Sequence, residues 1–304
     1  MNIAVAVDFS MESHFAVRWA LDLRNRLRDR ETPVNTFAVT IPADDQDFGY
    51  RTLAGLPTAT TEDAGVTHQI AHHIRDFLES VDYDVDDVQI VLEEGDPSEV
   101  ISRFCETHDI DWLVTGMNSS DALSRLVLGS TVHRLRELAP CNLVVVHPEH
   151  SRLQSPLDVA AGIDFLPGSE TALFGAASLA DVTGGHLHLV HALQEAPTGA
   201  SRRGPLSTLD PEDMARLEAD ANESLDMMMD EIRRQHPELN YSKLIHSGSA
   251  KKVLINYIAE QDIDAVCLGK VHHSTFEKWF FGSVSRALLK KMPTTLVLVP
   301  PEEA

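Results

Sequence analysis

The feature that most constrains the fold of this chain is an internal repeat. Residues 108–116 (HDIDWLVTG) match residues 261–269 (QDIDAVCLG) at an offset of 153 positions. The same offset relates further landmarks: Gly95 to Gly248, Gly129-Ser130 to Gly282-Ser283, Pro140 to Pro293, and Leu143–Val146 to Leu296–Val299. Near the start of each copy the offset is 156, which aligns residues 6–9 with residues 162–165. A constant offset across separate landmarks indicates a tandem duplication.

Each copy alternates short apolar runs with segments of helical periodicity. The first copy has apolar runs at 3–7, 34–41, 88–92, 112–115 and 142–147, and the second has them near 157–163, 186–193, 240–246, 264–268 and 294–299. Runs rich in Val, Ile and Leu between helices are typical of parallel strands buried on both faces. We therefore expect an α/β fold with two doubly wound, Rossmann-like domains in tandem, each with a five-stranded parallel sheet. The expected domains are residues 1–148 and 156–304, joined by a polar segment bracketed by prolines.

The composition of the chain argues against several classes of partner and location. The formal net charge is −22, and the acidic residues are spread along the chain rather than gathered in a tail. Such a surface repels nucleic acid phosphates and anionic lipids, so we expect neither as a partner. No apolar run is long enough for a transmembrane helix, and the N-terminus has no signal-peptide pattern. Three cysteines without a C-x-x-C motif fit a reducing compartment, so we expect a cytoplasmic protein.

The candidate binding residues follow the strands, where α/β sheets bind their ligands. Asp8 and Asp164 end the first strand of each copy, where a carboxylate either accepts hydrogen bonds from ribose hydroxyls or caps the next helix. Gly129-Ser130 and Gly282-Ser283 open helices, whose free N–H groups and dipole favour a phosphate. Taken alone, a Gly-Ser pair is more often an ordinary capped helix start.

In combination these residues resemble the universal stress protein family. Its ATP-binding members carry Gly-x2-Gly-x9-Gly-Ser/Thr after the fourth strand, and Gly116, Ser119 and Gly129-Ser130 share that frame with Gly269, His272 and Gly282-Ser283. The turn at 94–97 (EGDP) and the closing Pro-x2-Leu-Val-Val-Val also look like the family. The resemblance covers nearly the whole chain, twice. It implies that the two halves pack as an intramolecular pseudo-dimer through their fifth strands, with a homodimer of chains as a further option.

The resemblance also implies a ligand and its contacts. The ligand would be an adenine nucleotide, namely ATP, ADP or AMP, with or without Mg²⁺. The implied nucleotide-binding residues are Asp8, Val39, Gly116, Ser119, Gly129, Ser130 and Thr131 in the first half, and Asp164, Ala192, Gly269, His272, Gly282, Ser283 and Val284 in the second. The aspartate and first glycine would lie beside the ribose, the later residues beside the phosphates, and Val39 and Ala192 near the adenine.

One position departs from the family frame in both halves. Ser119 and His272 stand where the family has its second loop glycine, and a positive φ there would strain either residue. This departure supports an alternative function, a protein-interaction module that has lost nucleotide binding. We favour the first half for nucleotide binding because backbone geometry is harder to replace than charge, although Lys270, His273 and Lys278 surround the second loop.

No residue is assigned a catalytic or metal-binding role. The sequence contains no Gly-x-Ser-x-Gly, His-Glu-x-x-His or Walker A motif. Without an evident general base, slow ATP hydrolysis has little support. His186 and His188 share a strand face, and His68 and His72 lie one helical turn apart, but no cysteine or carboxylate completes a four-ligand zinc pattern. We therefore interpret these histidines as core or surface residues, and His191 as structural.

Overall fold

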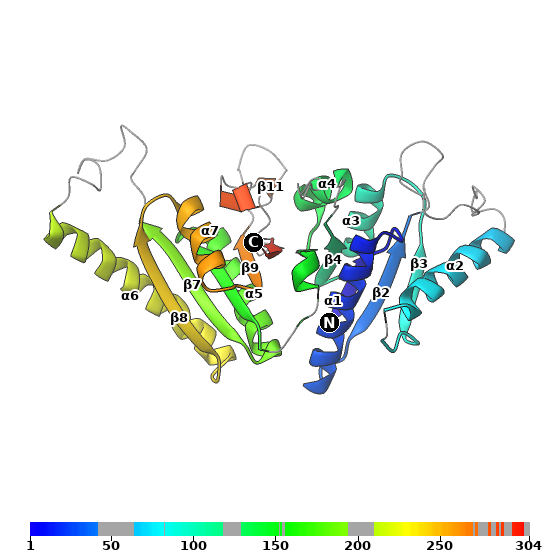
Figure 1. Ribbon diagram of the computed structural model, residues 1–304, viewed down its shortest axis with the longest axis horizontal. Helices are drawn as coiled ribbons and strands as arrows, with labels where there is room; N and C mark the ends of the chain where they lie inside the picture. The colour runs from blue at the N-terminus through cyan, green and yellow to red at the C-terminus, as the bar shows by residue number, and fades with distance from the viewer. Residues whose placement is uncertain are drawn as a thin grey trace. The chain divides into compact units, whose positions relative to one another are not determined.

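The computed structural model divides into two compact units, Met1–Arg152 and Leu153–Ala304, and each is described by itself (Figure 1). The structure describes the following residues: 1–41, 64–81, 83–117, 129–151, 153, 156–193, 210–269, 271–272, 279–280, 284–285, 287–288 and 294–300. Among the helices of this part of the chain, none combines the length and apolar character that crossing a membrane requires.

The first unit is a five-stranded parallel sheet in the order β3-β2-β1-β4-β5. Its strands are β1 (Asn2–Ala6), β2 (Asn35–Thr40), β3 (Val88–Leu92), β4 (Trp112–Gly116) and β5 (Asn142–Val146). The helices between them are α1 (Met11–Asp29), α2 (Ala64–Glu79), α3 (Pro97–Thr107) and α4 (Ser130–Leu138), followed by the short 3-10 helix η2 (Pro148–His150). Helix α1 packs on β1, β4 and β5, whereas α3 packs against α4.

The second unit repeats this sheet in the order β12-β9-β6-β7-β8. Its strands are β6 (Asp158–Ile163), β7 (His186–Leu193), β8 (Asn240–Ser247), β9 (Ala265–Gly269) and β12 (Thr295–Val299). The main helices are α5 (Pro167–Thr183), α6 (Pro211–Gln235) and α7 (Ala250–Glu260). The predicted fold class is therefore confirmed. The sequence did not predict the antiparallel ribbon of β10 (Val271–His272) and β11 (Trp279–Phe280), because two-residue strands carry no periodicity.

The duplication extends to unusual backbone conformations. Phe9 and Phe165, which match at the offset of 156, have φ angles of 63° and 60°. Asp109 and Asp262 have φ angles of 46° and 52°, and the glycines that follow β3 and β8 also have positive φ. Positive φ is unfavourable for residues with a Cβ, and more so for aromatic ones. The two units therefore keep the same strained turns, the first of them directly after the candidate aspartates.

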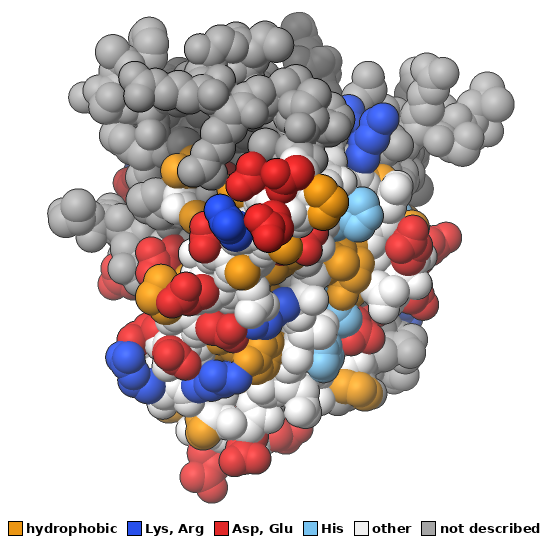
Figure 2. All heavy atoms as spheres, turned by 90° about the vertical axis from the view of Figure 1, so that its left-hand side faces the viewer, with side chains coloured by type: hydrophobic (Ala, Val, Ile, Leu, Met, Phe, Trp, Pro, Cys, Tyr) orange, Lys and Arg blue, Asp and Glu red, His pale blue; other side chains and the backbone are white. Residues whose placement is uncertain are grey.

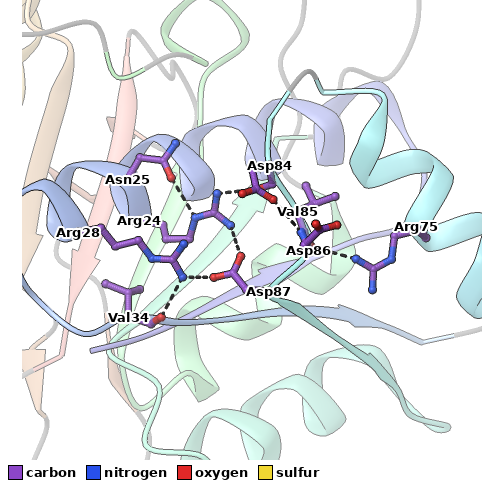
Figure 3. A network of polar contacts seen from close by, with 9 residues as sticks. All are labelled: Arg24, Asn25, Arg28, Val34, Arg75, Asp84, Val85, Asp86 and Asp87. Atoms are coloured by element: carbon purple, nitrogen blue, oxygen red, sulfur yellow. Dashed lines mark hydrogen bonds and ion pairs between the residues drawn. The ribbon is translucent and has the colours of Figure 1, made fainter.

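A buried arginine organises the turn before β3 (Figure 3). Arg24 is 1% exposed and donates hydrogen bonds to Asp87 Oδ1 at 2.9 Å and to the Asp84 carbonyl oxygen at 2.7 Å. Arg28 also pairs with Asp87. Burial alone would raise the pKa of Asp87, but the hydrogen bond from Arg28 and the charges of both arginines outweigh it, and the pKa lies below its ordinary value. The network ties α1 to the edge of the sheet.

Acidic side chains are spread over the surface that Figure 2 shows, which carries α6. Several of them are paired locally: Arg216 with Glu212 and Asp213, Arg233 with Asp230, Arg234 with Glu231, and Lys243 with Asp226. Of the three adjacent methionines in α6, Met229 is fully buried, whereas Met227 is 65% exposed. Consecutive helical positions face different directions, so only one of them can point at the sheet.

Candidate functional site

The first unit has a cleft at the carboxyl edge of its sheet. It encloses about 730 Å³, a volume that includes the open solvent at its mouth. The ends of β1, β2 and β4 meet the first turns of α1, α3 and α4 there. The residues that line it are Ala6, Val7, Asp8, Ser10, Glu12, Ser13, Val39, Ile41, Pro97, Ile101, Thr115, Gly116, Gly129, Ser130, Thr131 and Val132. Every candidate residue of the first half lies in this set except Ser119, which is outside the described residues.

Asp8 does not cap α1 itself but accepts hydrogen bonds from the serine that does, and its contact with ribose hydroxyls stays a prediction. Its Oδ1 accepts hydrogen bonds from the Ser10 backbone N–H at 3.0 Å and from Ser10 Oγ at 2.5 Å. Ser10 Oγ in turn accepts from the Ser13 N–H at 3.1 Å, which caps α1. Among the described residues no hydrogen bond reaches Asp8 Oδ2. The carboxylate is exposed, so this second oxygen is available to a ligand hydroxyl.

Gly116 has a structural reason to be glycine. A Cβ built on it would lie 2.2 Å from the Glu12 carbonyl oxygen in the first turn of α1. In the second unit a Cβ on Gly269 would lie 1.5 Å from the Gly168 carbonyl oxygen in the first turn of α5. These distances are far below van der Waals contact, so the close approach is between the strand end and the helix that follows β1 or β6. Both glycines are therefore needed for packing, with or without a ligand beside them.

The N-terminus of α4 contributes the polar side of the first cleft. Gly129 is the N-cap with extended backbone (φ −59°, ψ 156°), and it has no side chain to cap the helix. Its carbonyl oxygen accepts from the His133 N–H at 2.9 Å, which starts the helix. The first N–H groups of an α-helix have no partner within the helix, and here the residues that carry them line the cleft. This end of the cleft is therefore suited to an anion.

An arginine holds α4 against α3. Arg134 donates to Asp96 Oδ2 at 2.7 Å and to Glu99 Oε1 at 2.8 Å. Asp96 is also the N-cap of α3, and its Oδ1 accepts from the Ser98 and Glu99 N–H groups, both at 3.1 Å. The Ser98 hydroxyl, the Glu99 N–H and Arg134 lower the pKa of Asp96 against the opposing effect of desolvation. Arg134 thus joins the two helix starts that border the cleft.

The second unit has a matching cleft of about 830 Å³, counting its mouth. Its lining includes the predicted residues Asp164, Ala192, Gly269 and Val284. Gly282 and Ser283 lie outside the described residues, and for His272 the structure describes only its place in β10. The strand register also refines one assignment. Ala6 pairs with Val39, and its counterpart Gly162 pairs with Val190, so Val190 occupies the place of Val39 and Ala192 lies two residues further on.

Two histidines of β7, His188 and His191, take part in hydrogen bonds within the protein. His188 Nε2 lies 3.0 Å from Asp158 Oδ1, and its Nδ1 lies 2.8 Å from the Tyr257 hydroxyl and 3.2 Å from Ser242 Oγ. These hydrogen bonds link Ser242, His188 and Asp158 at the amino ends of the strands, opposite to the cleft edge. No sequence motif predicted this arrangement. His191 Nδ1 lies 2.9 Å from the Ile163 carbonyl oxygen, in line with the structural role expected for it.

Metal binding receives no support from the described part of the chain. No group of three or more His, Cys, Asp or Glu side chains there could hold a metal ion. His72 pairs with Asp76 on the exposed side of α2, and the side chain of His68 is outside the described residues. The three cysteines are buried, and burial raises the pKa of the Cys267 thiol well above its ordinary value. That thiol is protonated and unreactive at neutral pH.

The sequence pattern missed a whole class of lining residues. The first cleft is also lined by Ser10 at the N-cap of α1, by Glu12 and Ser13 in the first turn of α1, and by Pro97 and Ile101 of α3. The only feature of the sequence that marks these residues is their position at the start of a helix that follows a strand. Helix starts point at the carboxyl edge of a parallel sheet, so that position could have identified them.

Comparison with known proteins identifies the family. The model of the universal stress protein family matches residues 1–147 and 158–300. A protein of Staphylococcus aureus (strain USA300) that carries a universal stress protein name is 27% identical over 155 residues, covering 49% of this chain and 84% of its own length.

Among solved structures, a universal stress protein from Archaeoglobus fulgidus DSM 4304 aligns with a TM-score of 0.65 at 13% identity, covering 99% of this chain and 98% of its own. A structure of the same family name from Pseudomonas aeruginosa UCBPP-PA14 aligns with a TM-score of 0.62 at 14% identity, covering 99% and 93%. At these identities the structures support the fold, and the family model supports the assignment. This chain therefore belongs to the universal stress protein family and carries two of its domains in tandem.

Proposed function

We propose that this chain is a cytoplasmic stress-response protein that binds an adenine nucleotide, ATP, ADP or AMP, in its first cleft, without efficient turnover. The observation that carries the proposal is the convergence of Asp8, Val39 and the α4 N-terminus on one cleft. The carboxylate suits ribose hydroxyls, the apolar strand ends suit a base, and the helix start suits phosphates. The candidate residues thus supply each part of a nucleotide with a chemically matched partner.

The role of Mg²⁺ is part of the same proposal. Asp8 and Glu12 both line the first cleft, and two carboxylates near a polyphosphate are electrostatically unfavourable. A bound Mg²⁺ would offset that repulsion by neutralising phosphate charge. We therefore expect the affinity for ATP to be higher with Mg²⁺ than without it.

A second candidate function, a protein-interaction module without a nucleotide, is favoured by two observations. Asp8 Oδ1 is already occupied by Ser10, and Gly116 is required by the backbone of α1. Both residues therefore have reasons to be present that need no ligand. A direct measurement must separate the two functions.

The first experiment is to denature freshly purified protein and to chromatograph what it releases. Adenine nucleotide near one equivalent would support binding at one cleft, and calorimetry with ATP and Mg²⁺ would then be repeated on two matched variants. Ala6→Leu fills the floor of the first cleft, and Gly162→Leu does so at the same place in the second. The proposal predicts that Ala6→Leu abolishes ATP binding and that Gly162→Leu retains it. An empty protein without a calorimetric signal would leave the interaction module as the function.

A further inference from the structure

A cluster of polar side chains lies between α7 and the amino ends of three strands in the second unit. Its centre is the buried His188 of β7, which contacts Asp158 of β6, Ser242 of β8 and the Tyr257 hydroxyl of α7. The ring of His186 lies beside it, with 4.6 Å between the ring centroids. Helix α7 packs on β7 (Figure 1), and the hydrogen bond to Tyr257 is part of that contact. We call these five residues the His188 cluster.

The first unit has an apolar contact at the same place. The strand pairings make Phe37 of β2 the counterpart of His188, and the offset of 153 makes Phe104 of α3 the counterpart of Tyr257. The two phenylalanine rings meet edge to face with 5.5 Å between their centroids. The fold therefore accepts a purely apolar contact here, and burying polar groups instead costs desolvation. The His188 cluster is thus not required by the fold, which indicates another role.

The hydrogen bonds show where a neutral His188 carries its proton. Nε2 faces the carboxylate of Asp158, and an ionised carboxylate only accepts, so Nε2 is the donor and Nδ1 is left as an acceptor. Nδ1 then accepts from the hydroxyls of Tyr257 and Ser242. A further proton on the ring goes to Nδ1 and turns it into a donor, so both hydroxyl groups lose their acceptor. The charged ring would also remain buried beneath α7. Protonation therefore weakens the contact between α7 and β7.

His186 acts in the same direction. Burial, together with the charge of the neighbouring His188, lowers the pKa of His186 below its ordinary value of 6.5, against the opposing effect of Asp158. The folded unit therefore favours neutral His186. Its contribution to stability is complete above about pH 6.5, and it is lost as the pH falls from there toward the lower pKa of the folded protein.

The surrounding elements carry further titratable groups at this end of the sheet. They are Asp158 of β6, Tyr241 and Lys243 of β8, Tyr257 and Glu260 of α7, and Asp264 before β9. Tyr241 and Lys243 contact side chains of α6 on the opposite face, and Glu260 is exposed. The Asp264 carboxylate accepts from the Asp158 N–H at 2.8 Å. Asp158 is thus the carboxylate that contacts the His188 ring.

We propose that the His188 cluster is an acid-sensitive contact, at which proton uptake below neutral pH loosens α7 from β7 while α3 of the first unit stays docked. The first unit has a histidine near its phenylalanine pair, but His108 Nδ1 lies 3.1 Å from the Phe104 carbonyl oxygen and can donate to it in either protonation state. Ala250 and Leu254 of α7 line the second cleft, so the wall of that cleft would change with pH. This role does not depend on nucleotide binding.

The test is amide hydrogen exchange, followed by mass spectrometry on the full chain at about pH 7.5 and about pH 5.5 and corrected for the intrinsic effect of pH on exchange. We expect the protection of α7 to fall about tenfold or more at the lower pH, and that of α3 to change less than about twofold. Unchanged protection of α7, or an equal fall in both helices, would overturn the proposal.

Matched variants show whether the cluster is responsible for the fall. The double variant His188→Phe/Tyr257→Phe reproduces the contact of the first unit and should abolish the fall in α7. Two single variants, Tyr257→Phe and His186→Asn, each remove one part of the cluster and should make the fall smaller. Asparagine is the residue that the first unit has at the place of His186, namely Asn35. Circular dichroism verifies that each variant is folded. A fall as large as in the wild type, in any folded variant of the three, would contradict the proposal.

Discussion

At the scale of single residues, Gly116 shows how a ligand-loop signature and a packing requirement coincide. The glycine ends β4 beside the candidate cleft, yet the atom that a side chain would meet first belongs to the backbone of α1. Backbone cannot rotate away as a flexible side chain can, so the position excludes every residue with a Cβ. Its role in packing and any role in binding have to be separated by experiment.

We expect Gly116→Ala to destabilise the first unit by about 1–3 kcal/mol, because the methyl group forces β4 and α1 apart. The measurement is urea unfolding followed by tryptophan fluorescence. Gly184→Ala is the control, since Gly184 has a φ of 65° and no atom within 4 Å of an added Cβ. That control should cost about 1 kcal/mol for its backbone conformation alone. Equal costs for the two variants would contradict the packing explanation.

Asp87 should make the stability of the first unit sensitive to acid. Because its pKa in the folded protein is below the ordinary value of 3.8, Asp87 contributes stability above that value, and the contribution is lost as the pH falls through the folded pKa. Asp87→Asn should therefore be less stable than the wild type at neutral pH, and the difference should shrink below about pH 4. Asp86→Asn, a neighbouring change without an arginine partner in the described structure, is the control. Urea midpoints between pH 6 and pH 3 provide the measurement.

At the scale of elements, the starts of the helices distinguish the two units. Helix α1 begins at a serine that caps it, whereas α5 begins at a leucine that cannot. Helices α3 and α4 are joined by Arg134, whose counterpart in the second unit is Ala287. These differences leave the sheets alike and alter only the ends of the helices that border the clefts.

Leu166→Ser should stabilise the second unit by about 1 kcal/mol, because a serine at the N-cap satisfies an N–H in the first turn of α5. The gain should appear as a higher midpoint in differential scanning calorimetry. Leu166→Ala removes the same apolar surface without supplying a cap, so it separates the two effects. A gain as large from alanine would show that relief of exposed apolar surface, rather than capping, is responsible.

Arg134→Ala should weaken ATP binding at the first cleft several-fold while changing stability by less than about 1 kcal/mol, because exposed ion pairs add little to folding. The expected loss comes from a less well-fixed α4 start rather than from a lost ligand contact. Arg134→Lys should restore part of the affinity. The measurement is calorimetry on Gly162→Leu protein, in which the second cleft is filled. Unchanged affinity in Arg134→Ala would mean that the cleft keeps its shape without this clamp.

At the scale of the whole molecule, two units of one family need not respond to the same ligand. A ligand that binds only the folded first unit stabilises that unit by an amount that grows with its concentration, about 2.7 kcal/mol at one hundred times Kd. From the formal net charge of −22 we expect nucleic acid to be an unfavourable ligand for this chain. The effect of a ligand on stability should therefore be measured separately for each unit.

Hydrogen exchange followed by mass spectrometry can measure the effect of a ligand on each unit separately. Saturating ATP with Mg²⁺ should increase protection in β1, β4 and the first turn of α4, and should change β6 and β9 much less. Ala6→Leu should remove the effect on the first unit. Equal protection of both units by ATP would contradict the assignment of nucleotide binding to the first cleft.

The sequence by itself determined the duplication, the fold class and most element positions. The repeat, the apolar runs and the capping residues can each be recognised from residues that are close together in the sequence. Thus Gly129-Ser130 opens a helix as predicted. The frame of Gly116, Gly129 and Ser130 was sufficient to recognise the family, which the family model confirms.

Only the tertiary structure decided which residues face one another across elements. The approach of Gly116 to Glu12, the matching of Val190 with Val39 through strand register, and the joining of α3 to α4 by Arg134 depend on distances between segments far apart in sequence. Periodicity reports which face of an element is buried, and packing geometry determines what that face meets.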